Sequence, residues 1–144
     1  SSTESALLHT IAKLEKDYEF VITLPPTSPL LKSSSIVRAV EIFKSKVRDI
    51  DSLISVHESK DDIWHYENNI FKRIFPGEPR RQQDRKSLFI ENSAIYITKI
   101  SSLLKTKSIL GNICIPFKIN KREGLDINYK EDIKHIELYL GNKL

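Results

Sequence analysis

Cysteine and glycine are scarce in this sequence, and long apolar runs are missing. The single cysteine, Cys114, excludes a disulfide framework within the chain and is compatible with a reducing cytosol; its apolar neighbours predict a core position. No apolar run approaches the roughly 20 residues that span a bilayer, and the first residues do not form a signal region. We therefore expect a soluble, cytoplasmic protein that does not bind a membrane.

Several common catalytic motifs are also missing. The sequence has four glycines and contains neither a Walker loop nor a G-x-G-x-x-G segment. No Ser-His-Asp arrangement and no metal-ligand spacing can be assembled, because the histidines are far apart in sequence: His9, His57, His65 and His135. Within these residues, we therefore exclude a Ser-His-Asp catalytic triad, a zinc site and a glycine-rich nucleotide-binding loop.

Charge of one sign is not concentrated in any segment. The 23 Lys and Arg residues exceed the 19 Asp and Glu residues by four. Basic residues occur as adjacent pairs, namely Lys72-Arg73, Arg80-Arg81, Arg85-Lys86 and Lys121-Arg122. This scatter fits a phosphorylated small molecule better than a nucleic acid, although a solvated surface accounts for most of these charges. We expect no nucleic-acid partner.

The 144 residues, 40% of them hydrophobic, suffice for one compact domain, residues 1–144. Patterning predicts a helix from residues 1–3 to near Asp17, a strand over Phe20–Leu24, a helix beginning at Ser33–Ser35, and a strand over Leu53–Val56. The second helix is expected to bury Ile36, Val37, Val40, Phe43 and Val47. This alternation is typical of an α/β fold with a mainly parallel open sheet and helices on both faces.

The pattern changes over residues 57–90, which hold the only Trp, two Pro and many charges. Only Asn69–Phe75 has the look of a strand there, so we expect an excursion from the sheet that is functional or mediates contacts. The sheet is predicted to resume at Ala94–Ile97, followed by a short helix over Ser101–Lys105, a strand over Asn112–Phe117, and a final helix over Glu131–Leu140.

Two segments are candidates for ligand binding: a proline-rich loop with hydroxyl side chains and a run of basic residues. In Leu24–Leu30, Thr27 and Ser28 follow a strand end between prolines, where open α/β sheets bind ligands; a plain strand-to-helix turn explains the segment equally well. In Pro79–Arg85, the guanidinium groups of Arg80 and Arg81 suit carboxylate or phosphate, but a solvated basic loop is the more common use of such a run.

Two further segments carry amide and carboxylate groups. Asn92, in the turn that feeds a strand over Ala94–Ile97, is able to present its amide to a ligand, although Asn is also an ordinary turn residue. Asp126 and Asn128 share one side of an extended segment, and their hard oxygens suit Mg²⁺. An Asx turn that caps the last helix explains this pair slightly better.

Taken together, the order and spacing of these segments resemble N-acylneuraminate cytidylyltransferases and their relatives for legionaminic and pseudaminic acids. The Leu24–Leu30 loop resembles the family's Q-P-T-S-P-L loop, and Asp51–Val56 its D-S-V-V-S-V strand. The R-R-Q-D, E-N-G-A-I-Y-I and D-I-N motifs follow in order. The family's N-terminal L-A-R-x-G-S-K-type loop, which wraps the triphosphate, has no counterpart in these residues.

The resemblance implies a nucleotide-diphospho-sugar transferase-like fold and matches the family's C-terminal portion, N-terminally truncated before the CTP-binding loop. It implies transfer of CMP from CTP to a nine-carbon 2-keto sugar acid, with Mg²⁺ as cofactor and pyrophosphate as product. It also implies a homodimer formed through the excursion at 57–90. With the phosphate loop missing, the isolated chain is expected to be inactive or nearly so.

The resemblance also suggests roles for individual residues. Thr27 and Ser28 line the sugar site, while Asn92, Ala94 and Tyr96 shape its floor. Asp126 and Asn128 hold Mg²⁺. Arg81 faces anionic groups, although the register leaves Arg80 and Gln82 as alternatives at that position.

Departures from the family pattern are Pro25 for Gln, Ser93 for Gly and Asn128 for Asp. Two alternative functions stay open. One is a non-catalytic sugar-binding or dimer-assembly module, and the other is activation of an eight-carbon sugar acid.

Overall fold

The computed structural model describes residues 2–141. The chain divides into two compact units. The first unit comprises Ser1–His57 and Glu91–Leu144, and the second unit comprises Glu58–Ile90. The second unit thus covers almost the same residues as the excursion expected at 57–90. Each unit is described separately below.

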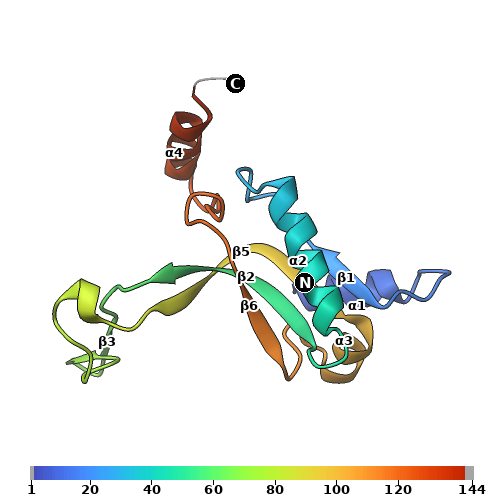
Figure 1. Cartoon of the computed structure of the whole chain (residues 1–144), viewed down its shortest axis with the longest axis horizontal. Coiled ribbons are helices and arrows are strands. Elements are labelled where there is room, and N and C mark those ends of the chain that lie inside the picture. Colours follow the sequence, from blue (N-terminus) through green and yellow to red (C-terminus); the bar gives the residue numbers. More distant parts are fainter. Residues whose placement is uncertain (1, 142–144) are drawn as a thin grey trace. The chain divides into compact units, whose positions relative to one another are not determined.

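A four-stranded sheet forms the centre of the first unit (Figure 1). Its strands are β1 (Phe20–Thr23), β2 (Ser52–Ser59), β5 (Leu88–Lys99) and β6 (Cys114–Lys118), in the order β1-β5-β2-β6. Strands β2 and β5 are long, and both continue into the second unit.

Three of these four strands run in one direction, and β5 runs against them. Strand β1 is antiparallel to β5, whereas β2 is parallel to β6. Between β5 and β2, Lys99 N–H donates to Asp51 O (2.8 Å) and Ile95 N–H to Ser55 Oγ (2.8 Å), which is the spacing of an antiparallel pair. The chain leaves the sheet at the end of β2 and re-enters at β5 without a crossover helix, so β5 must run back.

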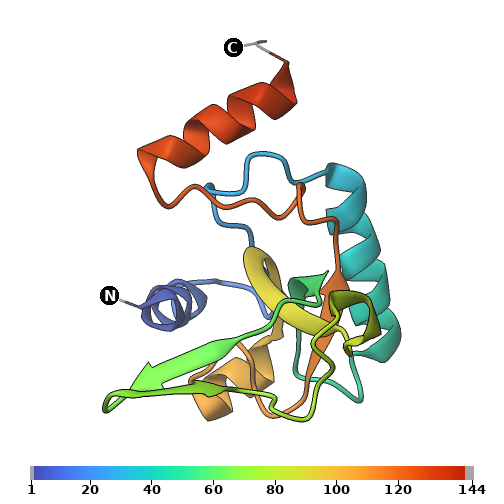
Figure 2. The same cartoon turned by 90° about the vertical axis from the view of Figure 1, so that its left-hand side faces the viewer.

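Helices cover both faces of the sheet, as expected. Helix α2 (Ser33–Lys46) lies on one face, and α1 (Thr3–Ile11) and α3 (Ile100–Thr106) lie on the other (Figure 2). Helix α4 (Lys130–Leu140) ends the described part of the chain. The predicted α/β architecture, with a central sheet and helices, is confirmed; the sheet is mixed, with β2 and β6 as its parallel pair.

The core lies between α2 and the sheet. Ala39 and Phe43 of α2 pack against Leu53, Ile95, Ile97 and Phe117. The Phe43 and Phe20 rings lie 5.3 Å apart, which adds an aromatic contact at the sheet edge. Val37 was expected in this core but is 56% exposed, because α2 buries the face that carries Ser35, Ala39 and Phe43 at intervals of four residues.

Two local predictions are wrong. Helix α1 ends at Ile11 rather than near Asp17, and Leu14 beyond it is exposed. Cys114 is exposed rather than part of the core. It lies on the edge strand β6, where Phe117 alone is buried and the other side chains are wholly or partly accessible.

The second unit contains a hairpin of β3 (Trp64–Glu67) and β4 (Ile70–Arg73) and a short 3-10 helix, η1 (Gln82–Asp84). The sequence predicted a single strand over Asn69–Phe75. The missed turn is made by Asn68 and Asn69, which both adopt positive φ (51° and 62°), as tight hairpin turns require.

Two arginines organise the rest of the second unit. Arg73 pairs with Asp62 and donates to the carbonyl groups of Glu78 and Pro79. Arg85 also pairs with Asp62 and donates to the carbonyl groups of Lys60 and Arg80. These contacts hold the loop after the hairpin in place, and the guanidinium groups lower the pKa of Asp62, with the Arg73 hydrogen bond as the main cause.

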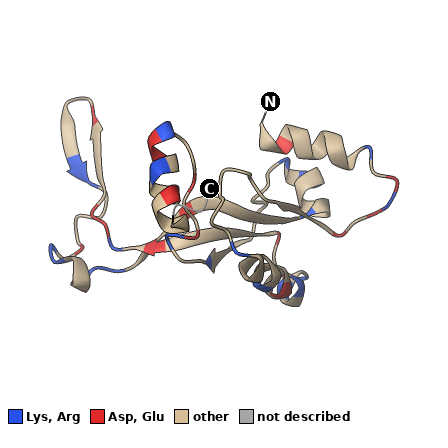
Figure 3. Ribbon diagram, turned by 90° about the horizontal axis from the view of Figure 1, so that it is seen from above, with Lys and Arg blue, Asp and Glu red and all other residues tan. Residues whose placement is uncertain are grey.

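Charged residues of both signs are spread along the chain, and α4 carries both along its length (Figure 3). Among residues 2–141, none of the helices is both long and apolar enough to cross a membrane.

Candidate functional site

A hollow of about 290 Å³ lies within the first unit, beside the end of β2. Three segments supply its lining: His57 after the buried part of β2, Glu91 to Ser93 of β5, and the loop before α4. That loop contributes Lys121, Gly124, Leu125, Asp126 and Asn128. The hollow therefore brings together Asn92, Asp126 and Asn128, three of the residues singled out from the sequence.

Asn92 is held at the floor of this hollow. Its Oδ1 accepts from Ser55 Oγ (2.6 Å) and, more weakly, from Ala94 N–H (3.4 Å). The next residue, Ser93, adopts a φ of 58°, the left-handed region that favours glycine. This conformation accounts for the glycine at the equivalent position of the E-N-G-A-I-Y-I motif.

Gly124 allows the Asn92 amide to approach the loop before α4. A Cβ atom on Gly124 would collide with Asn92 Nδ2 and Cγ. Glycine is thus required here by close packing rather than by its own backbone angle. Asn92 Nδ2 is buried and has no hydrogen-bond partner among the residues that the structure describes.

Asp126 is joined to the Leu24–Leu30 loop through its neighbour. Ile127 N–H donates to Thr27 O (2.9 Å), so Thr27 and Ser28 lie next to the Asp126 segment. Asp126 Oδ1 and Ser28 Oγ are both buried and, within residues 2–141, both lack a hydrogen-bond partner. Burial of polar atoms without partners is costly, and a bound ligand relieves that cost.

The helix-cap explanation of Asp126 and Asn128 is not supported. The carboxylate of Asp132 accepts from Asn128 N–H (2.9 Å) and Tyr129 N–H (2.8 Å) at the start of α4. These bonds also lower the pKa of Asp132, the Tyr129 bond most. The Asp126 carboxylate is therefore not used as the cap.

Tyr96 lies beneath the hollow and donates its hydroxyl hydrogen bond to Glu91 Oε1. Burial raises the pKa of Tyr96 to about 12, with further contributions from the Glu91 hydrogen bond and from the charges of Glu91 and Asp126. The phenol thus stays protonated at physiological pH. Ala94 is fully buried in the core and contributes its backbone N–H to Asn92 rather than a wall of the hollow.

The arginine motif belongs to the second unit, Glu58–Ile90. Arg80, Arg81 and Gln82 are exposed. Arg81 makes a loose ion pair with Asp84 (3.9 Å), and Gln82 a long hydrogen bond to Asp61 (3.4 Å). Because Arg85 has a structural role, Arg80 and Arg81 are the cations of this motif with accessible side chains.

The donor set around Asp126 fits Mg²⁺. Asp126 and Asn128 both line the hollow and offer a carboxylate and an amide oxygen, and Asp126 Oδ1 is a buried oxygen without a partner among the described residues. No group of three or more His, Cys, Asp or Glu residues within 2–141 is suited to a metal on its own. Mg²⁺ is commonly held by one or two carboxylates together with water and phosphate, so Asp126 and Asn128 would be its protein ligands here.

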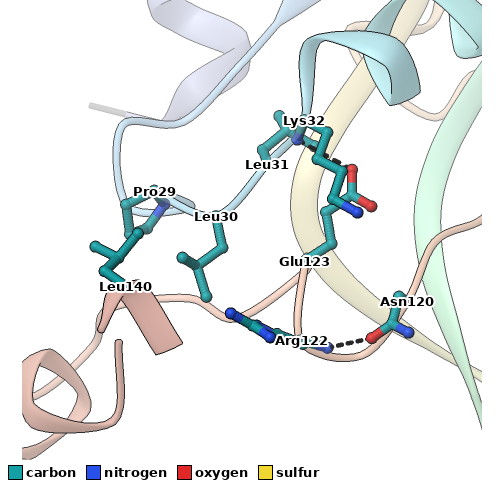
Figure 4. A pocket seen from close by; sticks show the side chains of 8 residues that line it. All are labelled: Pro29, Leu30, Leu31, Lys32, Asn120, Arg122, Glu123 and Leu140. Carbon is teal, nitrogen blue, oxygen red and sulfur yellow. Dashed lines mark hydrogen bonds between the residues drawn. The ribbon is translucent and has the colours of Figure 1, made fainter. Parts of the chain in front are cut away.

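A second, larger hollow of about 470 Å³ lies between residues 29–32, the 120–123 loop and Leu140 (Figure 4). Two of its charged side chains, Glu123 and Arg122, bond to other parts of the protein. Glu123 accepts from Lys32 N–H (3.0 Å), and Arg122 donates to Tyr139 O (2.6 Å). None of its described lining residues has a buried polar side-chain atom without a partner, so this hollow is the weaker candidate.

Sequence reasoning missed several residues of the site. Glu91 and Gly124 were not singled out, and His57 and Lys121 were assigned no function. The missed residues gave little signal, because their importance depends on which strands and loops become neighbours. Ser55, which holds Asn92, stands 37 residues before it in the sequence.

Comparison with known proteins supports the resemblance drawn from the motifs. No family model matches the chain. A protein of Streptococcus agalactiae serotype V named N-acylneuraminate cytidylyltransferase is 28% identical over 145 aligned positions, covering 94% of this chain and 34% of the relative. Its counterpart from serotype III is 27% identical with the same coverage. The chain thus spans about a third of the length of these curated relatives.

Solved structures show the fold. 4-Diphosphocytidyl-2C-methyl-D-erythritol synthase of Anaerococcus prevotii has a TM-score of 0.64 at 12% identity, covering 98% of this chain and 67% of that one. A CMP:2-keto-3-deoxy-manno-octonic acid synthetase complexed with CTP has a TM-score of 0.60 at 11% identity, covering 100% and 70%. The chain therefore shares the fold of these two solved structures, and its curated homologues are named N-acylneuraminate cytidylyltransferases.

Proposed function

We propose that this chain carries the sugar-acid side of a site that transfers CMP from CTP to a nine-carbon 2-keto sugar acid. The names of the curated relatives support the reaction class. The observation that carries the proposal is the grouping of Ser28 Oγ, Asn92 Nδ2 and Asp126 Oδ1, three buried polar atoms without partners in the described part of the chain. They belong to segments that meet beside the sheet.

In the proposed reaction, the anomeric hydroxyl oxygen of the sugar acid attacks the α-phosphorus of CTP. A new phosphorus–oxygen bond forms while the bond to the bridging oxygen breaks, and pyrophosphate leaves with that electron pair. The hydroxyl proton passes to solvent. No covalent bond to the protein is required, so the chain's residues act by positioning and by electrostatics.

Each residue then has a distinct task. Ser28 and Asn92 offer hydrogen-bond donors to the sugar acid, and Tyr96 supports the floor through Glu91. Asp126 and Asn128 would hold Mg²⁺, which neutralises phosphate charge when bound. Arg81, or Arg80 in the neighbouring register, supplies a guanidinium for the anionic groups of the substrates.

Isothermal titration of the 144-residue chain with N-acetylneuraminic acid tests the sugar-acid side directly. We expect binding by the native chain and about tenfold weaker binding by Asn92→Ala, the usual cost of one lost hydrogen bond to a charged or polar ligand. A competing titration with the eight-carbon 2-keto-3-deoxyoctonic acid decides between sugar classes. Failure to bind either acid contradicts the proposal.

A second candidate function is a non-catalytic sugar-binding module. The observation in its favour is that the buried polar atoms without partners among the described residues suit a sugar and do not themselves require CTP. Pyrophosphate release from CTP separates the two functions. Sugar-acid binding without any CTP binding or turnover supports the module, and CMP-sugar formation at normal enzymatic rates excludes it.

We also propose that the second unit pairs two copies of the chain. Apolar side chains are exposed on its hairpin, with Phe71 63% and Tyr66 67% accessible and Trp64 stacked on Phe71 at 4.6 Å. A two-stranded hairpin is marginally stable alone, and exposed aromatic clusters are typical of protein interfaces. A homodimer buries this cluster against its own copy.

A further inference from the structure

Ser55 is a fully buried polar residue of β2 that contacts the candidate site only through Asn92. Its hydroxyl donates to Asn92 Oδ1 at 2.6 Å and accepts from Ile95 N–H at 2.8 Å. The hydroxyl group therefore both donates and accepts a hydrogen bond within the protein. A hydroxyl fixed at both ends holds its acceptor in one orientation.

The orientation of the Asn92 amide has chemical consequences, because its two ends differ. One end accepts hydrogen bonds and the other donates them. The oxygen end is occupied by Ser55 and Ala94, so the nitrogen end is the one that lies against Gly124 in the lining of the hollow. Within residues 2–141, that buried Nδ2 has no partner.

We infer that Ser55 is a positioning residue that keeps Asn92 Nδ2 turned into the hollow, so that the site selects a ligand with an oxygen acceptor at this point. A carboxylate, carbonyl or hydroxyl oxygen of a sugar acid meets this requirement. The identity of that ligand rests on the proposed function, whereas the orientation of the amide does not. A reversed amide would face a carboxylate or carbonyl oxygen with Oδ1 and repel it, whereas a hydroxyl is able to donate to Oδ1.

The orientation is measured without a ligand by nuclear Overhauser effects in the ¹⁵N-labelled chain. We expect the Asn92 side-chain amide protons to show strong effects to the Gly124 Hα protons in the native chain. Ser55→Ala should weaken them severalfold, because the amide then rotates between both orientations. Ser55→Thr keeps the hydroxyl and should restore them.

Ser52→Ala is the matched control. Ser52 is an equally buried serine of β2 whose hydroxyl donates to Leu110 O, so its loss removes a buried hydrogen bond away from Asn92. This variant should leave the Asn92–Gly124 effects unchanged. Their absence in the native chain, or their full persistence in Ser55→Ala, overturns the inference. If Ser55→Ala does not fold, Ser55→Cys takes its place. Because a thiol is a weaker hydrogen-bond donor than a hydroxyl, the Asn92–Gly124 effects in this variant should be intermediate, and their comparison with the native chain then tests the inference.

Binding of N-acetylneuraminic acid supplies a second readout. Ser55→Ala should weaken binding about tenfold in the native background and less than about twofold in an Asn92→Ala background, because Ser55 acts through Asn92. Equal losses in both backgrounds indicate a purely structural role and contradict the inference. If the native chain does not bind the sugar acid, the proposed function fails, and the Overhauser effects still decide the orientation.

Discussion

The two units of the chain differ in whether buried polar atoms are left without partners. In the first unit, buried polar atoms of Ser28, Asn92 and Asp126 have no hydrogen-bond partner among the described residues. In the second unit, no buried side-chain polar atom of the described residues is left in this state, and the Asp62 carboxylate is shared by Arg73 and Arg85. Exposed apolar side chains occur in both units, but in the second unit several of them belong to one short hairpin, where Tyr66 and Phe71 are the most exposed.

This contrast separates two modes of recognition. Unpaired buried polar atoms are satisfied by a small polar ligand, whose donors and acceptors match them one by one. Exposed aromatic side chains gain most from burial against another protein surface. The same chain thus combines a ligand-binding unit with a unit suited to association. The predictions below test that division.

The largest effect is expected from Asp126→Ala in a form of the protein that makes CMP-sugar. Loss of a metal-binding carboxylate should lower the rate about a hundredfold and raise the Mg²⁺ concentration needed for half-maximal rate. Pyrophosphate release measured against Mg²⁺ concentration checks both. Asp132→Ala, which removes the α4 cap instead, should leave the Mg²⁺ requirement unchanged. A rate near that of the native protein would show that Asp126 has no part in the chemistry.

Phe71→Ser should weaken self-association tenfold or more (about 1.4 kcal/mol or above), because aromatic anchors carry much of an interface's binding energy. Sedimentation equilibrium over a range of concentrations measures it. Lys72→Ser, on the next residue of β4, is the control and should change association little. If both variants associate as the native chain does, or the native chain is a monomer at all concentrations, the hairpin is not the interface.

Arg80→Ala and Arg81→Ala should have unequal effects on activity. One of the two is expected to contact anionic substrate groups and to lose roughly fivefold to tenfold in kcat/KM, as for one charge-assisted hydrogen bond. The other should behave as a solvated surface cation. Steady-state kinetics at low ionic strength distinguishes them. Equal and negligible losses would assign both arginines to the solvated basic loop.

The smallest effect is expected from Asp51→Asn in the first unit. Hydrogen bonds from Asn112 N–H (2.7 Å), and then from Ile113 N–H, lower the pKa of Asp51. A lowered folded-state pKa adds stability above the ordinary carboxyl pKa, and that stability is lost as pH falls through the folded value. Since this carboxylate is partly exposed, the effect should be at most about 1 kcal/mol.

Thermal unfolding between pH 2 and pH 7 measures this effect. The Tm of Asp51→Asn should lie below that of the native chain at pH 7, and the difference should shrink as the pH approaches 2. Asp49→Asn, which removes an exposed carboxylate from the same loop, is the control. A difference that stays constant across this range would show that Asp51 stabilises the fold without its charge.

Helices and most strands were predictable because local patterns determine them. The apolar spacing of α2 and the serines at its start located it, and Pro25 after the first strand marked the strand's end. The direction of β5 was not predictable, because it depends on how the chain returns from the excursion. Cys114 was misplaced for a similar reason, since an apolar run does not reveal that its strand lies at the sheet edge.

The candidate site shows the same division. Motif order in the sequence identified Ser28, Asn92 and Asp126, because these residue types recur at family positions. Whether each of these side chains is hydrogen-bonded within the protein was not predictable. Whether a buried amide or carboxylate has a partner depends on atoms supplied by distant strands and loops, such as Ser55 for Asn92 and Asp132 for the α4 cap.

The sequence by itself determined the α/β class, the scarcity of glycine and cysteine, and the ordered motifs that point to cytidylyltransferases, since these are properties of composition and local spacing. Only the tertiary structure decided which motif groups are satisfied by the protein and which are left for a ligand. Hydrogen bonding and burial depend on contacts across tens of residues, as between Thr27 and Ile127, and no local pattern encodes them.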